Sequence, residues 1–167
     1  IIKMISDHYK QKGCLVVELL PEDYSYEMLN KTAISNDEEK WIKASSYTAA
    51  WKYLLYVIAM KVYIKDSNTI VKSKARPIYD YIRKNHKGYD KQGNWEILTN
   101  YIKRIEGIKI GTYEAGIKTK QLQELYKLED INNLLPSLKE LTQRKPIIFL
   151  IDELDKDAMV IFQSDHS

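Results

Sequence analysis

Residues 147–151 constrain the fold more than any other stretch. They read Ile-Ile-Phe-Leu-Ile and are followed at once by Asp152 and Glu153. An apolar run without polar alternation predicts a strand buried on both faces, as in a parallel sheet covered by helices. Ligands of open α/β sheets bind beyond the carboxyl ends of the strands. We therefore expect Asp152 and Glu153 to lie at the mouth of a site.

A second apolar run supports the same fold class. Residues 14–20 read Cys-Leu-Val-Val-Glu-Leu-Leu and follow a helical pattern over residues 1–13, in which Gly13 is placed to end the helix. A helix that leads into a buried strand is one half of a βαβ unit. Two such strands, far apart in the sequence, predict an α/β fold with a parallel core that carries a large insertion.

The sequence between the two strands is mostly helical in pattern. Apolar residues recur there at spacings of three and four, and Pro136 predicts a kink or a break. Residues 107–116 stay open between helix and edge strand: Ile108, Ile110 and Thr112 alternate as in an edge strand, but two glycines flank them. Helices are expected over residues 37–64, 76–85, 95–105 and 122–143.

Composition narrows the class of protein. Of the 167 residues, 44% are hydrophobic and 29% are charged, which is ordinary for a globular domain with a core of its own. A net charge of +3 is too small to argue for a nucleic-acid partner. The single cysteine, Cys14, excludes an internal disulfide framework and fits a reducing compartment. No apolar run approaches the ~20 residues that a membrane span needs, so we expect a cytoplasmic location without a membrane partner.

The chemistry of adjacent acids at a strand end suggests separate roles for them. Mg²⁺ prefers hard oxygen ligands and keeps several waters and substrate phosphates, so Asp152 suffices to hold it. Glu153 points to the other side of the backbone, where it can orient a water toward a γ-phosphate. The alternative is that both acids are only a polar strand end.

The usual partner of such a strand is a phosphate-binding loop, Gly-x-x-x-x-Gly-Lys-[Ser/Thr]. Residues 116–119 read Gly-Ile-Lys-Thr, but one extra residue precedes the lysine and the upstream glycine is misplaced. The helix at residues 1–13 is where the helix after such a loop would lie. We therefore expect the loop just upstream of Ile1, and we do not expect the chain as printed to bind ATP well or to be active alone.

Residues 147–156 resemble the Walker B segment of bacterial P-loop ATPases of the AAA/STAND superclass. The KAP-like branch and related defence- or repair-associated ATPases often carry Asp-[Asp/Glu]-Leu-Asp-[Arg/Lys] there, and this chain has Asp-Glu-Leu-Asp-Lys. Residues 16–24 and 49–52 are similar to the segment after the phosphate loop in some of these ATPases. The resemblance implies that Asp152 helps to hold Mg²⁺ and that Glu153 activates water for ATP hydrolysis. Residues 157–162 depart from the pattern, and no sensor strand or helical lid is recognisable.

This resemblance implies an incomplete P-loop NTPase core of parallel strands with a largely helical insertion. Residues 1–35 would begin the core, residues 36–120 would form the insertion, and residues 121–167 would contribute the Walker B helix and strand. ATP is the expected ligand, with a second copy or an effector protein as a further partner. The competing hypothesis is a non-enzymatic helical interaction module whose acids are structural.

Overall fold

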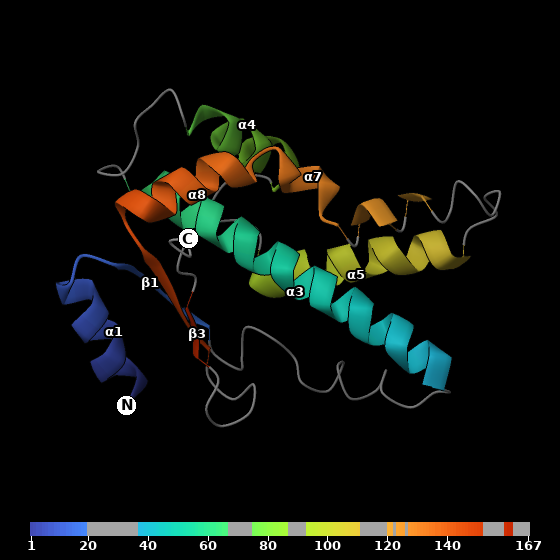
Figure 1. Cartoon of the computed structure of the whole chain (residues 1–167), viewed down its shortest axis with the longest axis horizontal. Helices are drawn as coiled ribbons and strands as arrows, with labels where there is room; N and C mark the ends of the chain where they lie inside the picture. Colours follow the sequence, from blue (N-terminus) through green and yellow to red (C-terminus); the bar gives the residue numbers. More distant parts are fainter. Residues whose placement is uncertain are drawn as a thin grey trace, which may run out of the picture.

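The computed structural model describes residues 1–19, 37–66, 75–86, 93–110, 120–121, 123–125, 127–151 and 159–161. Long helices and one small sheet make up this part of the chain (Figure 1). In chain order the elements are α1 (Ile2–Gln11), β1 (Leu15–Leu19), α3 (Asp37–Lys65), α4 (Arg76–Asn85), α5 (Asn94–Ile110), α7 (Glu129–Asn132), α8 (Leu135–Arg144), β2 (Ile147–Ile151) and β3 (Met159–Ile161).

The two predicted strands lie side by side. β1 and β2 pair in parallel over their full length, with Leu15 opposite Ile147 and Leu19 opposite Ile151. All residues of β2 are buried, because it is the central strand of the order β1-β2-β3. The parallel pairing predicted from the two apolar runs is therefore confirmed. β3, which pairs antiparallel with the other edge of β2, was not predicted.

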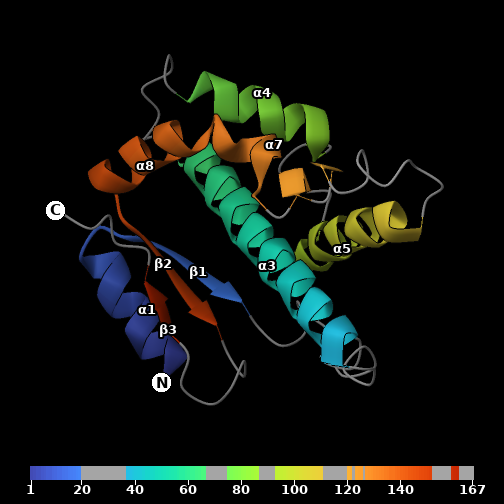
Figure 2. The same cartoon turned by 45° about the vertical axis from the view of Figure 1, so that its right-hand side comes forward.

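Helices cover both faces of this sheet. Alternate side chains of a strand point to opposite faces, and Ile147, Phe149 and Ile151 belong to the core that contains the buried residues of α3 and α8. On β1, Glu18 faces the other way, because its carboxylate accepts a hydrogen bond from Ser6 of α1. Figures 1 and 2 show the resulting layers, with α1 on one side of the sheet and α3 on the other.

A polar contact joins α1 to β1. Ser6 is fully buried, and its Oγ donates to Glu18 Oε1 at 2.5 Å, while Lys10 Nζ lies 3.5 Å from the same oxygen. The hydrogen bond from Ser6 lowers the pKa of Glu18; partial desolvation opposes this effect and Lys10 adds to it.

We predict that Ser6→Ala raises the pKa of Glu18 toward its ordinary value. A lowered pKa stabilises the folded state only while the carboxylate is ionised. The variant should therefore be less stable than the unchanged protein near neutral pH, and this difference should vanish as the pH falls through the folded-state pKa of Glu18. An NMR titration of the Glu18 carboxyl measures the shift directly, and an unchanged midpoint would contradict it.

The long helix α3 organises the helical part. Its buried side chains include Tyr53, Leu54, Val57 and Met60, and Trp51 packs against the same core. α5 and α4 pack along it (Figure 2). The helix predicted for residues 37–64 is thus confirmed. Its buried surface is broader than a single apolar stripe at spacings of three and four, because Tyr53, Val57 and Met60 outside that stripe are buried and Thr48 within it is exposed.

The alternative of an edge strand at Ile108 and Ile110 is wrong, because both residues lie in α5. Glycine costs a helix only about 1 kcal/mol relative to alanine, so Gly107 does not stop a helix that tertiary packing already supports. Thr112, the third residue of that alternation, lies outside the described residues.

The predicted break at Pro136 is confirmed. α8 begins at Leu135 with the proline in its first turn, where the missing backbone N–H costs nothing. α7 precedes it and begins after Leu128, whose φ of 58° is left-handed. That conformation costs a non-glycine residue roughly 1 kcal/mol or more, and the near-complete burial of the Leu128 side chain compensates for it.

Two polar contacts fasten the end of α3 to the start of β2. Lys145 Nζ lies 2.6 Å from Asp66 Oδ2, and Tyr63 donates its hydroxyl to the Lys145 carbonyl at 2.5 Å. The Lys145 and Asp66 side chains are only 30% and 14% exposed, so solvent screens this pair less than a surface pair.

We predict that Lys145→Met lowers the free energy of unfolding by about 1 to 2 kcal/mol, because it removes a half-buried charged hydrogen bond to Asp66. The matched control is Arg144→Met at the preceding residue. It removes an exposed ion pair with Glu140 and should cost less than about 0.5 kcal/mol. Urea unfolding of both variants measures the difference, and equal losses would contradict the role given to Lys145.

Candidate functional site

The strand edge where the sequence predicts a site is only partly described. β2 ends at Ile151, opposite Leu19 at the end of β1, so both parallel strands finish at the same edge of the sheet. Asp152 and Glu153, the predicted metal ligand and catalytic base, come next in the chain and lie outside the described residues. The roles of Asp152 and Glu153 therefore stay predictions. The structure describes only the strand β2 that leads to them.

Of the three histidines that could be metal ligands, His166 lies outside the described residues, and His8 and His86 lie within the described part of the chain. There, no group of three or more His, Cys, Asp and Glu side chains is arranged to hold a metal ion. His8 is exposed on α1, and His86 is buried beside tyrosines, so the two are not neighbours in one site. The assignment of Mg²⁺ to Asp152 rests on the sequence alone.

The sequence offers four arginines as possible phosphate contacts: Arg76, Arg83, Arg104 and Arg144. Arg83 is exposed on α4, and each of the other three has an acidic partner. Arg104 forms a forked ion pair with Asp130 that joins α5 to α7. Arg144 pairs with Glu140 one turn earlier in α8. Arg76 lies 3.9 Å from Asp80 in α4, and both side chains are well exposed. These pairs favour structural roles for the three arginines in this conformation.

A cluster of tyrosines around His86 was not anticipated from the sequence. Tyr53 of α3 lies 2.6 Å from the hydroxyl of Tyr81 in α4 and 3.2 Å from His86 Nε2 at the end of α4. Its ring also stacks on Tyr101 of α5, with centroids 4.1 Å apart, and Tyr101 donates to the Leu125 carbonyl. The cluster ties together three helices and the segment before α7.

The hydroxyl of Tyr53 can satisfy both of its neighbours at once. A hydroxyl has one donor and can accept twice, so it can donate to one of Tyr81 and His86 and accept from the other. The tautomer of His86 decides the direction. If Nε2 carries the proton, Tyr53 donates to Tyr81, and the Tyr81 hydroxyl hydrogen is left to point outward.

Burial keeps these phenols protonated. Desolvation raises the pKa of Tyr53, Tyr81 and Tyr101, and the nearby Asp130 carboxylate adds to the rise in all three. At neutral pH they act as hydrogen-bond donors and acceptors and not as bases.

The tyrosine cluster borders an open polar pocket of about 560 Å³. Its wall carries two cations, Lys84 and Arg104, and two anions, Asp80 and Asp130, so its formal charges balance. Arg104 and Asp130 already satisfy each other. Four helices contribute to the pocket and no short motif marks it, which is why sequence reasoning missed it.

We predict that Tyr53→Phe costs about 1 to 3 kcal/mol of unfolding free energy, because it leaves the buried His86 nitrogen without its hydroxyl partner. The ring stack on Tyr101 is retained, so the loss isolates the hydroxyl. Tyr9→Phe on α1 is the matched control and should change stability by less than about 0.5 kcal/mol. Thermal or urea unfolding compares the two, and a neutral Tyr53→Phe would contradict the hydrogen-bond assignment.

Comparison with known protein families, with curated proteins and with solved structures found no match. The resemblance of residues 147–156 to a Walker B segment therefore stands on those residues alone. Among the residues that the structure describes, no helix is both long and apolar enough to span a membrane.

Proposed function

We propose that this chain is a segment of a magnesium-dependent P-loop ATPase in which ATP hydrolysis drives a conformational switch. The observation that carries the proposal is the strand β2. It is buried on both faces, pairs in parallel with β1, and ends directly before Asp152 and Glu153. A helix precedes each of the two strands. This is the arrangement in which polar residues after a strand line a ligand site.

The proposal gives the two acids separate roles. Asp152 would hold the magnesium ion, which when bound neutralises charge on the phosphates of ATP. Glu153 would orient and polarise the attacking water. The phosphate-binding loop that the site also needs is proposed to lie upstream of Ile1.

The ties between α3 and β2 support the proposed switch. Lys145 lies two residues before the strand, and it is held both by Asp66 and by Tyr63 at the end of α3. A displacement of β2 on hydrolysis would therefore be passed to α3 and the helices that pack on it. An effector protein or a second copy that reads this movement is the proposed partner, in the cytoplasm.

A second candidate is a non-enzymatic helical interaction module. Two observations favour it: the sequence has no phosphate-binding loop, and three arginines are already paired with acids. In this alternative, Asp152 and Glu153 only terminate the strand.

Nucleotide titration separates the two candidates. ATP with Mg²⁺ is titrated into the printed chain and into a longer protein that includes the residues upstream of Ile1. The proposal expects micromolar binding only by the longer protein. Absence of binding in both would favour the interaction module, and micromolar binding by the printed chain alone would show that the proposed position of the phosphate loop is wrong.

A further inference from the structure

An apolar pocket opens between the sheet and the helical layer, and no residue of the tyrosine cluster lines it. Its volume is about 500 Å³, and its lining comes from α3, the end of α7, α8 and β2. Buried apolar side chains of α3, α8 and β2 form its floor, among them Leu138 and Phe149. The half-buried Tyr56 and Leu135 and the exposed Pro136 line its more accessible part. Small-molecule sites typically have this size and this mostly apolar lining, with a few polar groups that fix orientation.

The charge at this apolar pocket has one sign. Lys139 is its only charged lining residue, and no Asp or Glu lines it among the described residues. Its neighbour Glu140 is engaged with Arg144. Within the described part of the chain, the Lys139 ammonium has no hydrogen-bond or ion-pair partner. Lysine lays its apolar stem along such a wall and keeps its charge in water at the rim.

The other polar lining residues, Asn132 and Thr142, carry no charge that would pair with the Lys139 ammonium. Thr142 donates its hydroxyl to the Lys139 carbonyl at 2.8 Å, so its hydrogen is used within the helix. Asn132 is exposed and can contribute an amide donor beside the lysine. The apolar pocket thus combines an apolar interior with a rim that donates hydrogen bonds and carries positive charge.

We propose that this apolar pocket binds a free medium-chain carboxylate, with its acyl chain against Phe149 and Leu138 and its carboxylate at Lys139. The inference does not depend on the nucleotide proposal, because none of these residues belongs to the predicted nucleotide site. A ligand seated there touches β2 at Phe149, the middle residue of the strand that leads to Asp152 and Glu153.

The test is calorimetric titration of the printed chain with sodium octanoate at pH 7. Saturable binding at one site is expected. Hexanoate should bind about tenfold more weakly than octanoate, because it lacks two methylene groups and burial of each one contributes about 0.8 kcal/mol to the binding free energy. Octanol, which has a chain of the same length and no charge, should bind about threefold more weakly than octanoate. The difference is small because an exposed ion pair contributes little binding free energy.

Variants locate the site. Lys139→Gln should remove the advantage of octanoate over octanol, whereas Lys103→Gln on α5 should leave it unchanged. Ala59→Leu and Thr142→Leu each place a larger side chain in the apolar pocket and should weaken both ligands at least about tenfold. Circular dichroism shows which variants fold, and Thr142→Leu at the half-buried rim provides the test if Ala59→Leu does not.

Several results would overturn the proposal. Absence of saturable octanoate binding would exclude the site. Equal affinities for octanol and octanoate, unaffected by Lys139→Gln, would exclude the carboxylate assignment. Unchanged binding in a folded pocket-filling variant would place the ligand elsewhere.

Discussion

Replacing Glu153 by glutamine in the ATP-hydrolysing protein is expected to lower the turnover rate by at least about 100-fold, the effect of losing a positioned general base. Glutamine keeps the size of the side chain and can still form hydrogen bonds, but it cannot take a proton from water. Nucleotide binding should therefore persist. Steady-state phosphate release and equilibrium binding of ATP measure the two properties separately.

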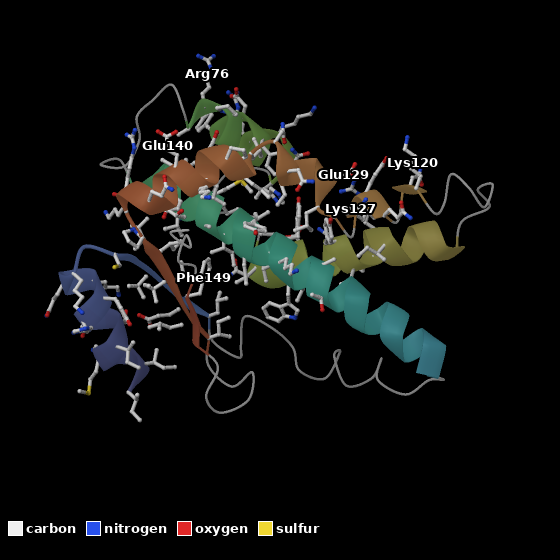
Figure 3. All side chains as sticks on the ribbon, in the orientation of Figure 1. Arg76, Lys120, Lys127, Glu129, Glu140 and Phe149 are labelled. Carbon is white, nitrogen blue, oxygen red and sulfur yellow. The ribbon has the colours of Figure 1, made fainter. Side chains whose placement is uncertain are left out.

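The control for this substitution is Glu129→Gln, the same chemical change on α7, where Figure 3 shows Glu129 on a helix away from the sheet. It should leave turnover unchanged. If Glu153→Gln hydrolyses ATP as fast as the unchanged protein, Glu153 is not the base. If it loses nucleotide binding as well, its role is structural or in binding, and the proposed division of work between the two acids is wrong.

Phe149→Ala is expected to reduce the free energy of unfolding by about 3 kcal/mol, near the lower end for a buried phenylalanine. The side chain is 1% exposed and sits at the middle of the central strand, beside α3 (Figure 3). The loss stays near the lower end because Phe149 borders the apolar pocket, so solvent can enter the space that the ring vacates. Urea unfolding monitored by circular dichroism measures it.

Two controls separate burial from a general effect of truncation. Phe149→Leu keeps most of the volume and should cost less than about 1.5 kcal/mol. Met4→Ala truncates an apolar side chain on α1 that is 76% exposed and should be close to neutral. A loss below about 1 kcal/mol for Phe149→Ala would mean that β2 is not the packed centre of the sheet.

β1, β2 and the longest helix were predictable because their patterns are local. An unbroken apolar run marks β2, and an apolar stripe at helical spacing marks α3, so each needs only its own residues to be recognised. The parallel pairing followed from the helix that precedes each strand. The end of α5 was misjudged because Ile108 and Ile110 fit both periods over so short a stretch, and the helix that begins at Asn94 continues through them.

The tyrosine cluster shows what a single sequence does not reveal. Tyr53, Tyr81 and Tyr101 each read as half-apolar residues of separate helices, and only the packing of α4 and α5 on α3 brings their hydroxyls and rings together. The apolar pocket has the same origin, since its wall combines α3, α8 and β2. Asp152 and Glu153 were predicted from the strand that precedes them, and their catalytic roles stay predictions.

The most direct test of the account is the ATP hydrolysis rate of the protein with the residues upstream of Ile1 present, measured as phosphate release with Mg²⁺ and again after its removal by a chelator. The account predicts release that requires Mg²⁺ and stops when the ion is removed. Absence of release under both conditions, or release that continues without any divalent ion, would contradict the assignment of this chain to a magnesium-dependent ATPase.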